Sequence, residues 1–369
     1  MDDTDNMRAA LALARRGLGS TWPNPSVGCV LVHDGRVVGR ATTAPGGRPH
    51  AERLALERAG AAARGATAYV TLEPCAHHGR TPPCADALIE AGVARVVIGC
   101  GDPYPAVAGA GIGRLRAAGL DVVTGVLEAD ALAVHAGFLH RVQTGRPLVT
   151  LKLATTLDGK IGTRSGESQW ITGIAARRHA HALRAQHDAV MVGVGTVLSD
   201  DPELTCRING FRRGPDLRIV ADSHLRTPLM SRVVASAREI PTWLLHAPDA
   251  DPVRLAAFRE TGVTLLAVPI AEPGIDLATA LARLGEAGLT SVLVEGGAQL
   301  ASALLRAGLV DRIAWYHAPS VMGGDGLPAA AAFGLQHLDA MPRFERIGLR
   351  TLGRDLLSLY SRTRESGVP

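Results

Sequence analysis

The stretch Thr71-Leu-Glu-Pro-Cys-Ala-His-His-Gly-Arg-Thr-Pro-Pro-Cys84, preceded by Pro49-His-Ala-Glu52, decides the class of the N-terminal half of this chain. His50 offers one imidazole, and Cys75 and Cys84 offer two thiolates. Catalytic zinc sites use three protein ligands and leave a fourth position for water, whereas structural sites close all four positions. We therefore predict a catalytic zinc site with His50, Cys75 and Cys84 as its metal ligands.

Glu52 is the candidate catalytic residue of this site. It lies two residues after His50 and is not needed as a ligand, so it can carry protons from the attacking water to a ring nitrogen and to departing ammonia. The order H-x-E followed by P-C-x-x-C is the signature of zinc-dependent deaminases. This chain keeps that order but places residues 76–83 between its two cysteines.

A closed structural zinc site is the alternative interpretation of the same motif. His77 or His78 would then supply the fourth ligand. The odd count of five cysteines is more typical of a reducing compartment than of a disulfide framework, so either interpretation points to metal binding.

Length and patterning predict two α/β domains. A chain of 369 residues is longer than a domain with a single hydrophobic core usually is. Both halves alternate apolar strand-like runs with Ala-rich helical stretches, which is typical of α/β sandwiches. Gly145 and Pro147 end a helix expected over 128–142 before a new strand at 148–154. We place the domains at residues 1–145 and 146–369. The other strands are expected at 27–33, 68–72, 93–99, 121–125, 189–193, 217–221, 242–245, 264–268, 291–295 and 311–316, and the other helices at 50–64, 84–91, 112–118 and 298–306.

Composition argues against membrane and nucleic-acid partners. No apolar run reaches the roughly 18 residues of a membrane helix, and the acidic N-terminus does not resemble a secretory signal. The net charge is only +4, and aromatic residues make up only 4% of the chain, so few side chains are available to stack on bases. Small anionic substrates or an Arg-rich surface would explain the charge equally well. We expect a cytoplasmic homo-oligomer.

Several further stretches extend these motifs over nearly the whole chain. They are Pro23-Asn-Pro-Ser-Val-Gly28, Leu151-Lys-Leu-Ala154, Leu157-Asp-Gly-Lys160, Ser165-Gly-Glu-Ser-Gln-Trp-Ile-Thr172, Val192-Gly-Val-Gly-Thr196, Asp200-Asp-Pro-Glu-Leu204 and Val294-Glu-Gly-Gly297. With the long loop between the cysteines, they resemble the bifunctional diaminohydroxyphosphoribosylaminopyrimidine deaminase / 5-amino-6-(5-phosphoribosylamino)uracil reductase family of riboflavin biosynthesis.

The resemblance implies a cytidine-deaminase-like αβα sandwich followed by a dihydrofolate-reductase-like α/β domain. It implies a zinc-dependent hydrolase that deaminates 2,5-diamino-6-(5-phosphoribosylamino)pyrimidin-4(3H)-one, and an NADPH-dependent oxidoreductase that reduces the ribosyl to a ribityl side chain. The cofactors would be Zn2+ and NADPH. Asn24 would hold the pyrimidine, although an Asn between two prolines is also a common turn residue.

The resemblance also assigns residues in the second domain. Those that would contact the cofactor are Ala154, Trp170, Thr196, Asp200, Ser223, Gly297, Ala298, Gln299, Leu300, Ala301, Ser302 and Ala303. Those that would contact substrate are Ser168, Arg184, Leu204, Arg207 and Glu295. Lys152 and Asp200 are the catalytic candidates here. From the residues alone, Trp170 could equally pack in the core, Arg184 could lie on a solvated helix face, and Asp200 or Asp201 could cap a helix.

One position departs from the family, and two rival functions remain open. Thr43 stands where family members often carry a histidine, which puts a substrate-phosphate contact there in doubt. The chain could be a zinc deaminase of another nucleobase or nucleoside with a degenerate second domain. It could also be a zinc-stabilised nucleotide-binding protein without turnover.

Overall fold

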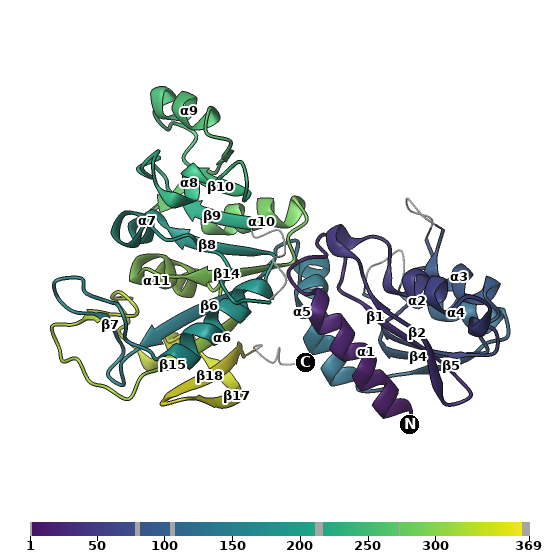
Figure 1. The fold of residues 1–369 in the computed structure, drawn as a ribbon. Coiled ribbons are helices and arrows are strands. Elements are labelled where there is room, and N and C mark those ends of the chain that lie inside the picture. The colour runs from purple at the N-terminus through teal and green to yellow at the C-terminus, as the bar shows by residue number, and fades with distance from the viewer. Residues whose placement is uncertain (1, 78–81, 104–107, 211–216, 273, 364–369) are drawn as a thin grey trace. The chain divides into compact units, whose positions relative to one another are not determined.

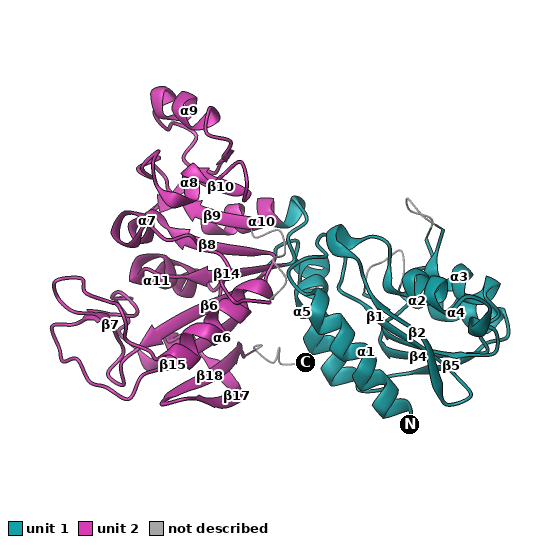
Figure 2. Ribbon diagram, in the orientation of Figure 1, with its two compact units in different colours: residues 1–147, 285–290 teal, residues 148–284, 291–369 magenta. Residues whose placement is uncertain are grey.

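The computed structural model describes residues 2–77, 82–103, 108–210, 217–272 and 274–363. The chain divides into two compact units, each with its own core (Figure 2). Unit 1 comprises Met1–Pro147 and Gly285–Thr290, and unit 2 comprises Leu148–Leu284 and Ser291–Pro369. Among the described residues, no helix is long and apolar enough to cross a bilayer.

Unit 1 is built on a five-stranded mixed sheet in the order β2-β1-β3-β4-β5 (Figure 1). β1 runs antiparallel to β2 and β3, whereas β3, β4 and β5 are parallel. Val96, Val97 and Ile98 are fully buried on β4, because both faces of the sheet are covered. Its strands are β1 (Gly28–His33), β2 (Arg36–Thr42), β3 (Thr67–Leu72), β4 (Arg95–Cys100) and β5 (Asp121–Thr124).

Helices cover both faces of this sheet. α1 packs on β1 and β3 and beside α5, while α2 packs on β1 and β2 and beside α3, which contacts α4. This arrangement confirms the αβα sandwich. The helices are α1 (Asp3–Gly17), α2 (Ala51–Ala59), α3 (Cys84–Glu90), α4 (Ala110–Ala117) and α5 (Glu128–Thr144), with short 3-10 turns at Pro45–Gly47 and Gly60–Ala63.

The helix predicted at residues 50–64 is shorter than expected. The pattern predicts a helix over 50–64, but α2 ends at Ala59 because Gly60 adopts a φ of 53°, and a 3-10 turn follows. A glycine in this conformation commonly ends a helix.

Unit 2 is built on a nine-stranded sheet in the order β11-β10-β9-β8-β14-β6-β15-β18-β17. The strands from β11 to β15 are parallel, so their carboxyl ends lie along one edge of the sheet. The C-terminal strands β18 and β17 add an antiparallel hairpin. The strands are β6 (Leu148–Thr155), β8 (Ala189–Gly193), β9 (Leu217–Ala221), β10 (Thr242–His246), β11 (Thr264–Ala267), β14 (Ser291–Glu295), β15 (Arg312–His317), β17 (Phe344–Leu352) and β18 (Asp355–Arg362).

The connections in unit 2 are helices and two small ribbons. The helices are α6 (Ile174–Ala185), α7 (Val194–Asp200), α8 (Arg232–Ala235), α9 (Pro252–Arg259), α10 (Leu277–Glu286) and α11 (Ala298–Arg306), with a 3-10 turn at Leu338–Ala340. The ribbons pair β7 (Lys160–Gly162) with β16 (Leu327–Pro328), and β12 (Ile270–Ala271) with β13 (Gly274–Ile275).

Candidate active sites

Three side chains in unit 1 meet at the starts of two helices and the end of a strand. His50 is the N-cap of α2, Cys84 is the first residue of α3, and Cys75 lies in the loop after β3. Their ligand atoms all lie within 4.8 Å of one another. Helix starts favour thiolates because their backbone amides and dipole stabilise negative charge.

The donor set and its spacing fit zinc. Zn–S bonds of about 2.3 Å and Zn–N bonds of about 2.0 Å put tetrahedral ligand atoms about 3.5 to 3.8 Å apart. His50 Nδ1 lies 3.7 Å from Cys75 Sγ and 3.3 Å from Cys84 Sγ. The Cys84 amide donates to Cys75 Sγ at 3.3 Å. Hydrogen bonding from Cys84 lowers the pKa of the Cys75 thiol to about 4, so this sulfur is deprotonated at neutral pH and can bind a metal as a thiolate.

Glu52 lies beside the cluster in the first turn of α2, with only 3% of its surface exposed. Its Oε2 has no hydrogen-bond partner among the described residues. Burial raises the pKa of this carboxyl above its ordinary value. A buried carboxylate oxygen without a protein partner fits a site that receives water or substrate.

The cluster has three ligands within the described part of the chain. His77 is not among them, and His78 lies outside the described residues. The closed structural site therefore gains no support from His77.

Asn24 and Thr43 lie in two neighbouring loops that are joined by hydrogen bonds. Asn24 Nδ2 donates to the Gly47 carbonyl at 2.8 Å, which fixes the side chain and leaves its Oδ1 available to a pyrimidine. Thr43 is 2% exposed, and its Oγ1 accepts from the Val27 amide at 2.9 Å and donates to the Pro25 carbonyl at 3.1 Å. Thr43 thus serves the backbone and does not present a group to a phosphate.

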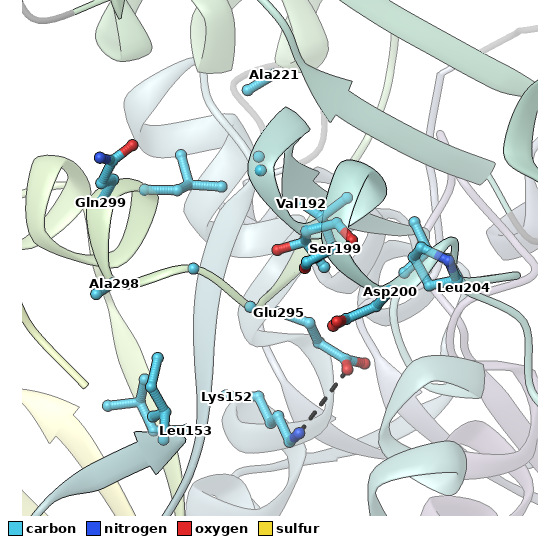
Figure 3. Close-up of a pocket in the computed structure, with 18 of the residues that line it drawn as sticks. Lys152, Leu153, Val192, Ser199, Asp200, Leu204, Ala221, Glu295, Ala298 and Gln299 are labelled. Atoms are coloured by element: carbon cyan, nitrogen blue, oxygen red, sulfur yellow. Dashed lines mark hydrogen bonds and ion pairs between the residues drawn. The ribbon is translucent and has the colours of Figure 1, made fainter. Parts of the chain in front are cut away.

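Unit 2 holds a cavity of about 2130 Å³ along the carboxyl ends of β6, β14, β8 and β9 (Figure 3). Single-ligand pockets usually enclose about 300–1,000 Å³, so this one has room for two molecules. The predicted residues that line it are Lys152, Ala154, Ser168, Trp170, Arg184, Thr196, Asp200, Leu204, Arg207, Ser223, Glu295, Gly297, Ala298, Gln299, Leu300 and Ala303.

Two predicted cofactor contacts lie away from this cavity. Ala301 and Ser302 are buried on α11, and neither lines the cavity. The Ser302 hydroxyl instead accepts a hydrogen bond from the Ala331 amide at 2.7 Å. Successive residues of a helix point in different directions, so a continuous run from 297 to 303 cannot all face one ligand.

Glu295 joins two cations at the floor of the cavity. Arg184 donates from Nε to Oε1 at 2.6 Å and from Nη2 to Oε2 at 2.9 Å, and Lys152 Nζ lies 3.9 Å from Oε2. Figure 3 shows the Lys152 and Glu295 side chains pointing toward each other. Burial raises the pKa of Glu295, but the attraction of Arg184 outweighs it and leaves the pKa at about 2. Burial lowers the pKa of Lys152. Arg184 is therefore not on a solvated helix face.

The turn between β14 and α11 consists of two glycines, and its backbone lines the cavity. Gly296 and Gly297 have φ values of 79° and 59°. A Cβ on Gly296 would lie only 2.6 Å from Thr196 Oγ1, so any larger residue at position 296 would clash with the Thr196 side chain. The free amides at the start of α11 suit an anion such as a pyrophosphate.

The remaining predicted residues lie on the cavity walls. Trp170 is 63% exposed, so it is not a core residue, and the Arg177 guanidinium stacks 4.5 Å from the centre of its ring. Asp200 ends α7 with its side chain exposed, and Asp201 follows in a left-handed conformation. Asp200, Leu204 and Glu295 all line the cavity (Figure 3).

Comparisons with known proteins find relatives of both halves of the chain. Residues 147–358 match the family described as RibD C-terminal domain, and residues 1–100 match the cytidine and deoxycytidylate deaminase zinc-binding region. The riboflavin biosynthesis protein RibD of Escherichia coli K12 is 45% identical over 368 residues, covering 96% of this chain and 98% of the relative. The RibD protein of Actinobacillus pleuropneumoniae is 44% identical and covers 98% of this chain and 95% of its own length. The chain belongs to the RibD family.

Solved RibD structures share the fold over almost the whole chain. Acinetobacter baumannii RibD, form 1, superposes with a TM-score of 0.87 at 38% identity, covering 98% of this chain and 99% of that chain. A diaminohydroxyphosphoribosylaminopyrimidine deaminase/5-amino-6-(5-phosphoribosylamino)uracil reductase from Thermotoga maritima gives 0.84 at 35% identity with the same coverage. These matches confirm the predicted fold of both halves.

Sequence reasoning missed two groups of residues that support the RibD sites. Glu73, just before Pro74 and Cys75, accepts four backbone amide bonds that include the start of α4. A buried acid beside the ligand motif was a signal that could have been used. His179 Nδ1 lies 2.8 Å from the Tyr316 hydroxyl, and Lys152 Nζ lies 5.9 Å from the centre of the Tyr316 ring. No sequence pattern pointed to that pair.

Proposed function

We propose that this RibD chain performs two successive reactions on one phosphoribosylaminopyrimidine. Residues 1–145 would hydrolyse an amino group of 2,5-diamino-6-(5-phosphoribosylamino)pyrimidin-4(3H)-one, and residues 146–369 would reduce its ribosyl chain with NADPH. The observation that carries the proposal is the close approach of His50, Cys75 and Cys84 beside Glu52, whose Oε2 has no hydrogen-bond partner among the described residues. The activity named for the Thermotoga maritima relative also supports it.

In the first reaction, water adds to the ring carbon that bears the amino group, and ammonia leaves as the carbon–nitrogen bond breaks. A zinc ion held by His50, Cys75 and Cys84 would lower the pKa of water toward neutrality, so that a strong nucleophile is present at working pH. Glu52 would take a proton from the attacking water and deliver protons to the ring nitrogen and the departing amine. Its raised pKa suits a group that must both accept and return a proton. Asn24 would hold the pyrimidine through Oδ1.

In the second reaction, NADPH held in the cavity of unit 2 would supply the hydride that reduces the anomeric carbon of the ribose, and the ring oxygen would gain a proton as its bond to that carbon breaks. Lys152 is the proposed proton donor, since burial lowers its pKa and eases release of a proton. Glu295 would keep Lys152 and the Arg184 guanidinium in place beside the substrate. Ser168, Leu204 and Arg207 would complete the substrate side of the cavity, with Asp200 between substrate and cofactor.

The cofactor would lie across the glycine turn. Its pyrophosphate suits the amides of Gly297 and Ala298 at the start of α11. Ala154, Trp170, Thr196, Ser223, Gln299, Leu300 and Ala303 are the other proposed contacts that line the cavity.

The rival functions differ in what they predict for the two candidate sites. A degenerate second domain would not need a paired Lys152–Glu295–Arg184 cluster opposite a glycine turn, and both are present. A binding protein without turnover would not need a buried carboxylate oxygen, Glu52 Oε2, left without a described partner beside three metal ligands. We further propose a cytoplasmic homo-oligomer without nucleic-acid or membrane partners. Scattered arginines and few aromatics support the lack of nucleic-acid binding.

One experiment tests both activities. Purified protein is incubated with the diaminopyrimidinone phosphate, with and without NADPH, and the products are identified by mass. We expect replacement of an amino group by oxygen without NADPH, and the further gain of two hydrogens with it. Deaminated product that NADPH leaves unchanged would support the degenerate-domain alternative. No ammonia from a zinc-loaded protein would refute the deaminase assignment.

A further inference from the structure

Lys152 has a charged neighbour on one adjacent strand and an aromatic neighbour on the other. In the sheet of unit 2, β6 runs between β14 and β15. Glu295 of β14 pairs directly with Lys152, and Tyr316 of β15 pairs with Ala154, two residues further along β6. Because side chains alternate between the two faces of a sheet, Lys152, Glu295 and Tyr316 all project from the same face. The Lys152 side chain therefore lies between Glu295 and Tyr316.

Glu295 attracts the Lys152 ammonium but does not fix it. The distance of 3.9 Å between Lys152 Nζ and Glu295 Oε2 is longer than a hydrogen bond. The same carboxylate accepts two hydrogen bonds from Arg184, at 2.6 and 2.9 Å, so it is shared between two cations. Burial lowers the pKa of Lys152, the attraction of Glu295 opposes this shift, and the positive charge of Arg184 adds to it. A second group that favours the ammonium would offset the burial.

The Tyr316 ring is placed to be this second group. Lys152 Nζ lies over the ring, 5.9 Å from its centre. The face of an aromatic ring attracts a cation within about 6 Å, and the attraction is stronger where water is excluded. Tyr316 is only 1% exposed. A neutral amine gains no such attraction, so the contact favours the protonated state that a proton donor needs.

His179 of α6 fixes the orientation of the Tyr316 ring. Its Nδ1 lies 2.8 Å from the Tyr316 hydroxyl, and the two rings meet edge to face with their centres 5.9 Å apart. Burial lowers the pKa of His179 and raises that of Tyr316, so both groups are neutral near pH 7 and share one hydrogen bond. Ala176 and Ala180 of the same helix pack with Tyr316 in one hydrophobic cluster. These contacts restrict rotation of the ring.

Helix α6 thus holds both neighbours of Lys152. Arg184 bonds to Glu295, and His179, five residues earlier, bonds to Tyr316. Within the described ranges, neither His179 nor Tyr316 lines the cavity. The pair is therefore placed to act on Lys152 rather than on a ligand.

We propose that Tyr316, held by His179, is a positioning residue of the reductase whose ring keeps the Lys152 ammonium in place to protonate the ribose ring oxygen. The inference rests on the proposed reductase function, in which Lys152 is the proton donor. NADPH supplies the hydride, Lys152 supplies the proton to the ring oxygen, and the amine regains a proton from solvent after the product leaves. Tyr316 itself exchanges no proton in this step.

The first test measures how reduction by the full-length protein depends on pH, with 5-amino-6-(5-phosphoribosylamino)uracil and NADPH as substrates. A proton donor must be protonated, so kcat/KM should fall at alkaline pH as Lys152 loses its proton. Tyr316→Leu removes the ring, so this fall should occur about 0.5 to 1 pH unit lower, and kcat should drop about 3- to 10-fold. Tyr316→Phe keeps the ring, so its alkaline fall should stay where the wild type has it. Tyr360→Leu is the control, because Tyr360 pairs with Ile313 and lies on the opposite face of the sheet.

A double-mutant cycle tests the part of His179. His179→Leu and Tyr316→Phe each remove the hydrogen bond between the two rings. Each should lower kcat about 2- to 5-fold, in line with one neutral hydrogen bond, and leave the KM for NADPH unchanged. The double variant should lose no more activity than either single variant, because both changes break the same contact.

The other outcomes separate the inference from the function on which it rests. An alkaline fall in Tyr316→Leu at the wild-type pH would overturn the inference, since the ring would then not favour the ammonium. If Tyr316→Leu does not fold, as shown by lost NADPH binding, the cycle decides alone, and additive losses in the double variant would overturn the inference. A wild-type protein that does not reduce the uracil substrate, or that shows no alkaline fall, would instead refute the proposed reductase chemistry.

Discussion

The Glu73 carboxylate accepts a hydrogen bond from the Gly111 amide at 2.9 Å, which joins the loop carrying Cys75 to the start of α4. The same oxygen accepts from the Ile112 amide at 3.1 Å, and Oε2 accepts from the amides of Gly109 and Asp102. A Cβ on Gly111 would meet the Pro74 carbonyl at 2.0 Å, so the helix start packs directly on this loop. Glu73 is 4% exposed, and these bonds place it to position Cys75, the proposed metal ligand two residues later.

Glu73→Gln should loosen the zinc site without touching its ligands. The amide NH2 of glutamine would face backbone N–H donors that now point at Oε2, and a buried donor left unsatisfied is costly. Residues that orient metal ligands typically contribute 10- to 100-fold to metal affinity. We expect zinc retention to fall by about this factor in chelator competition, with NADPH-dependent reduction of deaminated substrate unchanged. Glu57→Gln, on the exposed side of α2, removes the same charge and serves as control. Equal zinc retention in the two variants would show that Glu73 does not position Cys75.

Glu295→Gln should disable the reductase and spare the deaminase. Gln has one oxygen, so it cannot accept both Arg184 bonds and also neutralise Lys152, and it leaves two buried cations close together. We expect kcat/KM for reduction to fall at least about 100-fold, since a fork–fork contact both positions and neutralises the guanidinium. Glu345→Gln on the exposed β17 is the matched charge control. Retention of near wild-type reduction by Glu295→Gln would remove this cluster from the reductase site.

Acid should destabilise unit 2 through His187. This imidazole donates from Nδ1 to the Leu183 carbonyl at 2.8 Å, and in the neutral ring Nε2 accepts from the Thr150 hydroxyl at 2.9 Å. Burial lowers its pKa from the ordinary 6.5 to about 4. Between these values the unfolded chain binds a proton and the folded unit does not, so stability falls as the pH falls from 6.5 to 4.5, by about 2 kcal/mol.

Denaturant unfolding at pH 6.5 and 4.5 measures this loss. Tryptophan fluorescence reports mainly on unit 2, which holds Trp170, Trp243 and Trp315 of the four tryptophans. His187→Gln has no titrating ring, so its stability should change less over this window than that of the wild type. An identical pH dependence in both proteins would mean that His187 is not buried in its neutral form.

The sequence predicted most central strands and the zinc ligands for a common reason. Buried parallel strands such as β4, β8 and β14 are continuous apolar runs, which identify a strand without knowledge of its neighbours. The ligand motif is similarly local, because His50 and Cys84 lie at the starts of two helices and Cys75 directly follows a strand. These features depend on short-range sequence alone.

The features that were missed depend on partners far along the chain. β17 is mostly exposed and, among the described strands, pairs with β18 alone, so its sequence carries four polar or charged residues and little apolar alternation. Glu73 is important because of amides some 30 to 40 residues later, and Tyr316 because of His179, 137 residues earlier. The position of Ala301 and Ser302 on the inner side of α11 likewise follows from packing rather than from the run of residues itself.

The last prediction separates proton transfer from metal binding in unit 1. Glu52→Gln keeps the size of the side chain, and Glu52 is not among the three clustered ligand atoms, so the variant should retain about one zinc per chain by elemental analysis. Its deamination rate should fall by at least about 10²- to 10⁴-fold, the usual effect of losing general acid–base catalysis. Cys84→Ser should lose or weaken zinc, because it replaces a thiolate by a hydroxyl that ionises far less readily. Both variants should still reduce deaminated substrate with NADPH at the wild-type rate, since that chemistry is proposed for unit 2. If Glu52→Gln deaminated normally, or released zinc as readily as Cys84→Ser, Glu52 would be a structural or ligand residue and the proton-transfer role would be refuted.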